Sequence, residues 1–174
     1  MGWLQYQDLI ERATTSKNDV YPLLENPHAF RQVIQDLTKL IENLSFDKVA
    51  GLEATGMVFG AALAHHTNKG FIAIRRSGKW PYRETELLSQ TCTDYSNTQK
   101  RFVLRKNQVS PPEDILVFDD WLETGAQFQT ATKLLTKAGA NVVAGTFLAV
   151  DKNEATRPIL QKHDIRCLRP IQGE

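Results

Sequence analysis

The segment from Ile115 to Gln127 contains the residue types that can do chemistry. A short apolar run precedes Asp119 and Asp120, and a Thr124-Gly125 turn then leads into an amphipathic, helix-length segment. The run predicts a strand buried on both faces that ends at the Asp pair. Ligands of open α/β sheets bind at strand carboxyl ends, and helix N-termini offer free N–H groups to anions. The two carboxylates could bind hydroxyls or a metal ion, and the turn beside them could bind a phosphate, which together suit a phosphorylated sugar. The alternative interpretation is a solvated turn with an N-cap.

A second segment, Gly51 to Gly60, repeats the order of strand, small-residue turn and helix start. Ala54, Thr55 and Gly56 allow a backbone to approach a ligand closely, and exposed N–H groups there suit a pyrophosphate. A plain connection between strand and helix, with glycine chosen for packing, is the alternative interpretation.

A third segment, Ile74 to Pro81, places cations just past a strand end. Arg75, Arg76 and Lys79 lead from that strand into a long polar stretch. Three positive charges here would neutralise phosphate oxygens. A solvated basic turn is the alternative, and the two anion-binding turns nearby favour the phosphate role.

Strands that alternate with helices predict an α/β fold with a doubly wound parallel sheet and flanking helices, in a single domain over residues 1–174. Asn26-Pro27 is a helix-start signal, and apolar residues then follow the 3.6-residue period from Ala29 to Leu44. The expected strands are Lys48–Leu52, Phe71–Ile74, Ile115–Phe118, Val142–Val150 and Ile165–Leu168, and the other expected helices are Trp3–Arg12, Gly56–His66, Leu122–Ala138 and Asn153–Lys162.

Hydrophobic periodicity disappears between Arg75 and Arg101. A structureless loop of this length is uncommon in a compact domain unless it is functional. We therefore expect a functional loop, which carries a short hairpin that includes Phe102–Leu104.

Composition narrows the function classes. The chain has 174 residues, 41% of them hydrophobic, with a formal net charge of +1, so no basic excess is available for nucleic acid. Cys92 and Cys167 do not form a disulfide framework or zinc pattern. No segment reaches the roughly 20 apolar residues of a membrane span, and the N-terminus has no signal-peptide pattern. We expect a cytoplasmic protein with neither nucleic-acid nor membrane partners.

Three motifs at their observed separations resemble the type I phosphoribosyltransferases: GLEATGMVFGAALA, FIAIRRSGKWP and ILVFDDWLETGAQ. The Gly78-Lys79-Trp80-Pro81 segment favours the adenine branch, and the resemblance extends from about residue 18 to 168. It implies transfer of ribose 5-phosphate from phosphoribosyl pyrophosphate to a purine-type nucleobase in purine salvage, with Mg²⁺ and release of pyrophosphate. It also implies a small hood over the sheet and a homodimer, to which the helix segment Phe59–Leu63 would contribute.

The resemblance assigns roles to the residues of all three motifs. Asp119 and Asp120 would accept hydrogen bonds from the ribose hydroxyls, directly or through water bound to Mg²⁺, and would stabilise a cationic sugar. The loop from Arg75 to Arg101 would be a lid that excludes water, with Asp94 as its acid/base candidate; a solvated loop carboxylate is the alternative for Asp94. The 5′-phosphate would be held by Glu123, Thr124, Gly125, Ala126 and Gln127, and the pyrophosphate by Ala54, Thr55, Gly56, Arg75 and Lys79.

Several residues depart from the family pattern. Thr55 stands where the adenine enzymes carry Arg, Glu123 and Gln127 replace small residues of the phosphate turn, and Trp121 replaces an aliphatic residue. Lys17 and Asn18 stand where an aromatic residue and an Arg precede the Asp of the N-terminal motif. The acceptor base is therefore open, with Trp121 a candidate stacking partner. The alternative function is a non-catalytic sensor of phosphoribosyl pyrophosphate or nucleotide; a receiver-like protein would not explain the Gly-Lys-Trp-Pro segment.

Overall fold

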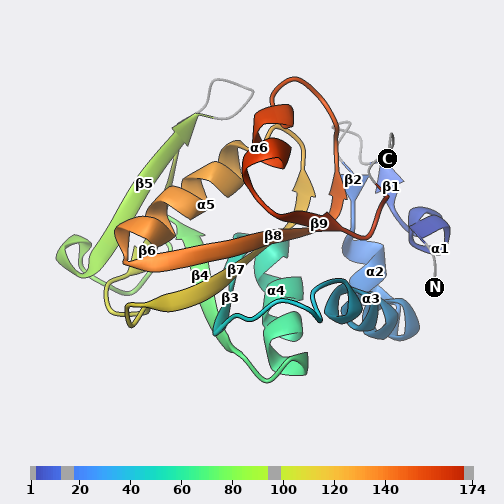
Figure 1. The fold of residues 1–174 in the computed structure, drawn as a ribbon, viewed down its shortest axis with the longest axis horizontal. Helices are drawn as coiled ribbons and strands as arrows, with labels where there is room; N and C mark the ends of the chain where they lie inside the picture. The colour runs from blue at the N-terminus through green and yellow to red at the C-terminus, as the bar shows by residue number, and fades with distance from the viewer. Residues whose placement is uncertain (1–2, 13–17, 94–98, 171–174) are drawn as a thin grey trace.

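A seven-stranded sheet forms the centre of the computed structural model, which describes residues 3–12, 18–93 and 99–170 (Figure 1). The strand order is β5-β6-β4-β3-β7-β8-β9. The pairs from β4 to β9 are parallel, whereas β6 is antiparallel to both β4 and β5. The strands are β3 (Lys48–Leu52), β4 (Gly70–Arg76), β5 (Leu87–Thr93), β6 (Gln99–Arg105), β7 (Glu113–Leu122), β8 (Ala140–Val150) and β9 (Ile165–Cys167). The predicted doubly wound parallel sheet is confirmed, with an antiparallel hairpin added at one edge.

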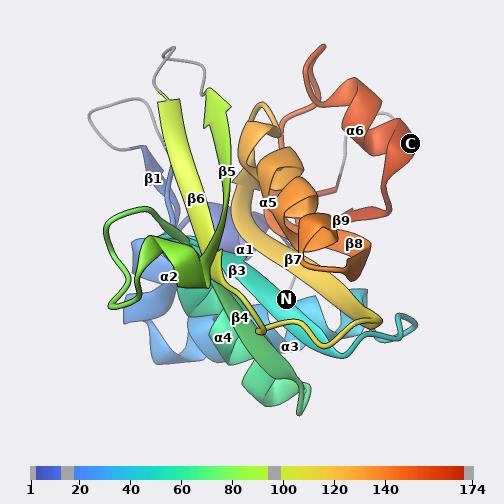
Figure 2. The same ribbon diagram turned by 90° about the vertical axis from the view of Figure 1, so that its left-hand side faces the viewer.

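Helices cover both faces of the sheet, as Figure 2 shows with the sheet between them. One apolar core lies beneath α5 (Ala126–Lys137) and α6 (Arg157–Lys162). The other lies beneath α2 (Tyr21–Glu25), α3 (Pro27–Leu40) and α4 (Thr55–His66). Of the helices that the structure describes, none combines the length and apolar character that crossing a membrane requires.

The predicted start of α3 is confirmed. The Asn26 side chain accepts hydrogen bonds from the backbone N–H groups of His28 and Ala29, at 3.0 and 3.1 Å. These bonds satisfy two donors that the first turn of a helix leaves unpaired, and Pro27 at the first position has no N–H to satisfy.

Strand β7 is longer than its apolar run predicts. The expectation that it ends at the Asp pair is wrong, because the strand continues to Leu122. Its last residues remain paired with β8, with Trp121 opposite Ala149 and Leu122 opposite Val150. The carboxylates therefore project from a strand rather than from a solvated turn. For the same reason α5 starts at Ala126 instead of Leu122.

The segment with no hydrophobic period contains regular structure. Strands β5 and β6 form the expected hairpin, but it is longer than predicted and extends the central sheet through β4. Its polar residues hide the strand pattern because one face of this edge is exposed to solvent. Asp94 and Lys17 lie outside the described residues.

Both short terminal helices differ from expectation. Helix α1 (Trp3–Gln7) ends before Arg12, because β1 (Glu11–Arg12) pairs antiparallel with β2 (Asn18–Asp19). Helix α6 starts at Arg157, because the Asn153 side chain accepts backbone hydrogen bonds in a turn before it.

Two residues of the α4 segment that we expect to contribute to a dimer lie in the core instead. Phe59 and Leu63 are fully buried in the core, so they are unavailable to a partner. Val58 is the exposed large apolar residue of this helix, at 45% exposure.

Gly125 makes the turn before α5 possible. Its φ is +76°, and a Cβ there would lie 2.0 Å from Cδ1 of Ile159. Gly78 has a similar φ of +80°, but a Cβ there would meet no atom within 4 Å. Substitution of either glycine would therefore strain the backbone, but only at Gly125 would the new side chain also clash with a neighbour.

We predict that Gly125→Ala lowers the free energy of unfolding by about 2–5 kcal/mol, from left-handed strain plus overpacking. Gly78→Ala should lose only about 1 kcal/mol, from strain alone. Urea denaturation measures both losses, and equal losses would show that packing against Ile159 does not hold this turn.

Candidate active site

Asp119 and Asp120 lie at the end of β7 against the first turn of α4. The Asp119 side chain is 7% exposed, and its Oδ1 accepts a hydrogen bond from the Asp120 N–H at 3.1 Å. Asp120 Oδ1 accepts from the Trp121 N–H at 2.9 Å. A Cβ on Gly56 would lie 2.7 Å from Asp119 Oδ1, so only glycine lets the α4 backbone approach this carboxylate so closely.

Burial dominates the electrostatics of the pair. It raises the pKa of Asp119 well above its ordinary value, and the neighbouring Asp120 charge raises it further. Burial also raises the pKa of Asp120, against opposing hydrogen bonds that include one from Thr55. None of the described Lys, Arg or His side chains forms an ion pair with either carboxylate. The pair is therefore poised for donors or cations brought by a ligand.

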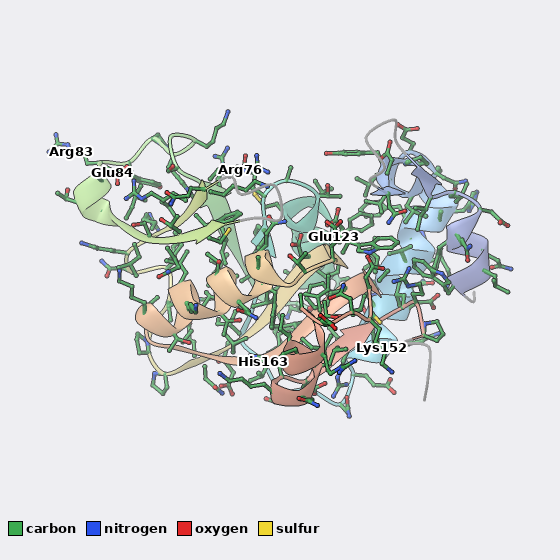
Figure 3. The ribbon with its side chains drawn as sticks, turned by 90° about the horizontal axis from the view of Figure 1, so that it is seen from above. Arg76, Arg83, Glu84, Glu123, Lys152 and His163 are labelled. Carbon is green, nitrogen blue, oxygen red and sulfur yellow. The ribbon has the colours of Figure 1, made fainter. Side chains whose placement is uncertain are left out.

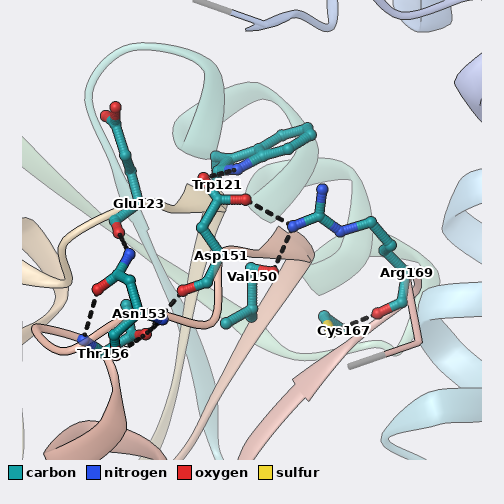
Figure 4. A network of polar contacts seen from close by, with 8 residues as sticks. All are labelled: Trp121, Glu123, Val150, Asp151, Asn153, Thr156, Cys167 and Arg169. Carbon is teal, nitrogen blue, oxygen red and sulfur yellow. Dashed lines mark hydrogen bonds and ion pairs between the residues drawn. The ribbon is translucent and has the colours of Figure 1, made fainter. Parts of the chain in front are cut away.

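The turn of residues 123–127, which is the candidate phosphate-binding turn, follows the carboxylates. Gly125 is the N-cap of α5 without a side-chain capping bond, so the first N–H groups of this helix remain open to an anion. The Thr124 hydroxyl is 3.5 Å from the Ala126 N–H. The Glu123 carboxylate is exposed and points away from the network below it, while its carbonyl accepts a hydrogen bond from Asn153 (Figure 4). The Glu123 carboxylate thus takes no part in this network.

One cavity of about 1050 Å³ joins these parts. It is lined by most of the residues predicted from the sequence: Ala54, Thr55, Asp119, Asp120, Glu123, Thr124, Gly125, Ala126 and Gln127. Gly56 lies buried behind Asp119 and does not line the cavity. The carboxylate pair therefore shares one space with both turns that are candidates for anion binding.

Two predicted pyrophosphate ligands lie elsewhere. Arg75 Nε is 3.5 Å from Glu53 Oε2, and its guanidinium packs over the Trp80 ring, 5.5 Å from the centroid. Lys79 is exposed, and neither side chain lines the cavity. Their role as pyrophosphate ligands stays a prediction. Arg75 and the neighbouring Arg76 differ in position because successive side chains of a strand point to opposite faces.

Arg76 and Lys100 line the cavity instead. Arg76 ends β4 and pairs with Phe102, and Lys100 lies two residues before Phe102 on β6 (Figure 3 shows Arg76). Arg76 was included in the basic motif, but Lys100 was missed because the polar sequence around it has no strand signal. Side chains alternate between the two faces of β4, and this alternation is the sequence signal that distinguishes Arg76, which lines the cavity, from Arg75, which does not.

The other end of the cavity is aromatic. Trp3 from α1 and Trp121 from β7 line it with their ring centroids 6.3 Å apart, together with Asp151 after β8 and Arg169 after β9. Sequence reasoning identified only Trp121 of these four residues. The other three lie far apart in the chain and meet only through the order of the sheet.

The carboxylate oxygens of Asp119 and Asp120 fit one hard cation that takes only part of its ligands from the protein. Mg²⁺ prefers oxygen ligands and usually retains several waters beside one or two carboxylates. Among the described residues no cluster of three or more His, Cys, Asp or Glu could hold a metal. Asp119 and Asp120 therefore suit a Mg²⁺ ion whose other ligands are water and ligand oxygens.

The raised pKa of Asp119 predicts how stability depends on pH. At low pH Asp119 is protonated, and its burial then costs little free energy of unfolding. As pH rises through the raised pKa of Asp119 in the folded protein, the carboxyl ionises and that stability is lost. Asp119→Asn carries no charge, so it should be more stable than the parent by on the order of 1–3 kcal/mol at pH 8, with the gain vanishing toward pH 4. Denaturant titrations at several pH values measure this gain. The exposed control Glu154→Gln should show no such trend, and a gain independent of pH would contradict the assignment.

Comparisons with known proteins identify the family. No family model matches the chain. The adenine phosphoribosyltransferase of Thermosipho africanus is 34% identical over 151 residues, which are 86% of each chain, and that of Parvibaculum lavamentivorans is 33% identical over 86% of this chain and 83% of that protein.

Solved structures agree. The adenine phosphoribosyltransferase of Thermoanaerobacter pseudethanolicus superimposes with a TM-score of 0.87 at 28% identity, over 95% of this chain and 98% of that one. The Saccharomyces cerevisiae enzyme, in complex with an imino-altritol bisphosphate and adenine, has the same fold, with a TM-score of 0.82 at 21% identity over 95% and 97%. Because relatives of this identity cover most of its length, the chain belongs to the adenine phosphoribosyltransferase family.

Proposed function

We propose that this protein transfers ribose 5-phosphate from phosphoribosyl pyrophosphate to a purine base, with release of pyrophosphate, in purine salvage. The observation that carries the proposal is the single cavity in which a desolvated carboxylate pair lies between two anion-binding regions. Phosphoribosyl pyrophosphate has the matching order of groups, with phosphate, sugar hydroxyls and pyrophosphate along one molecule.

The phosphate-binding turn would hold the 5′-phosphate through the open N–H groups of α5. Asp119 and Asp120 would then face the ribose hydroxyls and accept hydrogen bonds from them. The pyrophosphate would lie by Ala54 and Thr55, where Arg76 and Lys100 supply positive charge. These two cations take the role that we first expected of Arg75 and Lys79.

Transfer requires a base nitrogen to form a bond to the anomeric carbon while the bond from that carbon to the pyrophosphate oxygen breaks. The bonding electron pair and negative charge leave with pyrophosphate, and the base loses a proton. The sugar becomes cationic in between, and two buried carboxylates stabilise that charge electrostatically. Mg²⁺, when bound, would neutralise pyrophosphate charge. Asp94 stays a candidate acid/base residue, and it lies outside the described residues.

We infer further that the protein works in the cytoplasm as a homodimer. Neither Cys92 nor Cys167 takes part in a disulfide within the described residues, which fits a reducing compartment. Val58 on α4 offers an exposed apolar residue for a partner.

Release of pyrophosphate tests the proposed function. Purified protein with Mg²⁺, phosphoribosyl pyrophosphate and a panel of purine bases should release pyrophosphate with at least one base. Asp120→Asn should lower kcat by about 100-fold or more, because one preorganised electrostatic group is lost. Glu154→Gln, which also turns a carboxylate into an amide but is exposed outside the cavity, should leave kcat unchanged. Binding of the activated sugar without release by any base would instead support the non-catalytic sensor.

A further inference from the structure

The sheet order divides the cavity into two chemically different ends. Arg76 and Lys100, on β4 and β6, form its cationic end, while Asp119 and Asp120 lie on β7 near the middle of the sheet. The aromatic end consists of Trp3, Trp121, Asp151 and Arg169, beside and beyond β7. In the proposed reaction the base and the pyrophosphate lie on opposite sides of the anomeric carbon. The base therefore belongs at the aromatic end, where an indole ring offers a stacking surface.

Arg169 is fixed in place at this end. Its backbone N–H donates to the Leu148 carbonyl at 3.0 Å, and its own carbonyl accepts from the Cys167 thiol at 2.8 Å. Nη2 of its guanidinium donates to Asp151 Oδ1 at 2.6 Å and to the Val150 carbonyl. Figure 4 shows both contacts from this one nitrogen.

Trp121 is held by the same carboxylate. Its Nε1 donates to Asp151 Oδ2 at 2.9 Å, and the Arg169 guanidinium packs over its ring, 4.8 Å from the centroid. The Arg169 guanidinium also packs over the Trp3 ring, with its Cζ 6.0 Å from the ring centroid. One Asp thus fixes both the aromatic surface and the cation beside it, so neither side chain must be ordered when a ligand binds.

The second terminal nitrogen of Arg169, Nη1, makes no hydrogen bond within the described part of the chain. The side chain is 29% exposed and lines the cavity, so this nitrogen offers donors and positive charge to a bound base. A carbonyl oxygen accepts such a bond, whereas an exocyclic amine is itself a donor and is repelled. Arginine pairs with the carbonyl edge of guanine for this reason, while Asn and Gln suit adenine.

We propose that Arg169 determines base specificity and that the acceptor is a purine with a carbonyl at C6 rather than adenine. The inference rests on the proposed transferase function. It names a substrate class that differs from the one in the names of the related enzymes. Arg169 acts as a carbonyl-binding residue, and Asp151 acts as a positioning residue for both Arg169 and Trp121.

The ratio of kcat/KM for hypoxanthine to kcat/KM for adenine tests this proposal. The unmodified protein should favour hypoxanthine by about 10- to 100-fold, the effect of one charge-assisted hydrogen bond. Arg169→Met should abolish most of this preference. Purine has no group at C6 and so lacks both the hydrogen bond and the repulsion; its kcat/KM should lie between those of hypoxanthine and adenine for the unmodified protein.

Arg157→Met is the matched control, because Arg157 is exposed on α6 and does not line the cavity. It should keep the full ratio. Turnover of adenine as efficient as that of hypoxanthine by the unmodified protein would overturn the proposal, and this result is decisive even if Arg169→Met fails to fold. A ratio that Arg169→Met leaves unchanged would overturn it as well.

Failure of the proposed function can be distinguished from failure of this inference. If no base supports pyrophosphate release, the transferase proposal fails, and tryptophan fluorescence with inosine and adenosine 5′-monophosphates then decides the specificity. Tighter binding of the inosine nucleotide by about tenfold or more, lost in Arg169→Met, supports the carbonyl-binding role. Equal or weaker binding overturns it.

Discussion

Two adjacent carboxylates held out of water are the interaction on which the rest of the site depends. Asp119 and Asp120 lie near the end of β7, just before its last paired residues, with the α4 backbone packed against Asp119 at Gly56. No described cation offsets them, and burial raises the pKa of both. Such a pair costs stability in the free protein, because charge in a desolvated site is unfavourable. A ligand with hydroxyl donors and a developing positive charge recovers that cost, so stability and binding depend on the same residues.

The order of the sheet arranges the remaining groups around this pair. Strands β4 and β6 bring Arg76 and Lys100 to one side, and the segments after β8 and β9 bring Asp151 and Arg169 to the other. The turn after β7 places the N-terminus of α5 beside both carboxylates. A ligand that spans the cavity therefore meets cations, carboxylates and aromatic rings in a fixed order. This order matches a pyrophosphate, a ribose and a purine.

The parts of this arrangement that local sequence encodes could be predicted. The Asn26 cap, the buried strands and the carboxylate pair beside the Thr124-Gly125 turn all follow from neighbouring residues. The hairpin of β5 and β6 was only partly visible, because an edge pair with one solvated face has few apolar residues. The presence of Arg76 rather than Arg75 in the cavity lining depends on strand alternation at the cavity edge. The contact of Trp3 with Trp121 and Arg169 depends on long-range topology that no local pattern contains.

Equilibrium binding of a nucleotide with and without its ribose hydroxyls tests the central assignment most directly. Calorimetric titration would compare inosine 5′-monophosphate with its 2′,3′-dideoxy analogue, which has the same phosphate and base. If Asp119 and Asp120 accept hydrogen bonds from the hydroxyls, the dideoxy analogue should bind at least about tenfold more weakly, because the hydrogen bonds from both hydroxyls to these carboxylates are lost. Equal affinities for the two nucleotides would contradict the assignment of the carboxylate pair to the ribose.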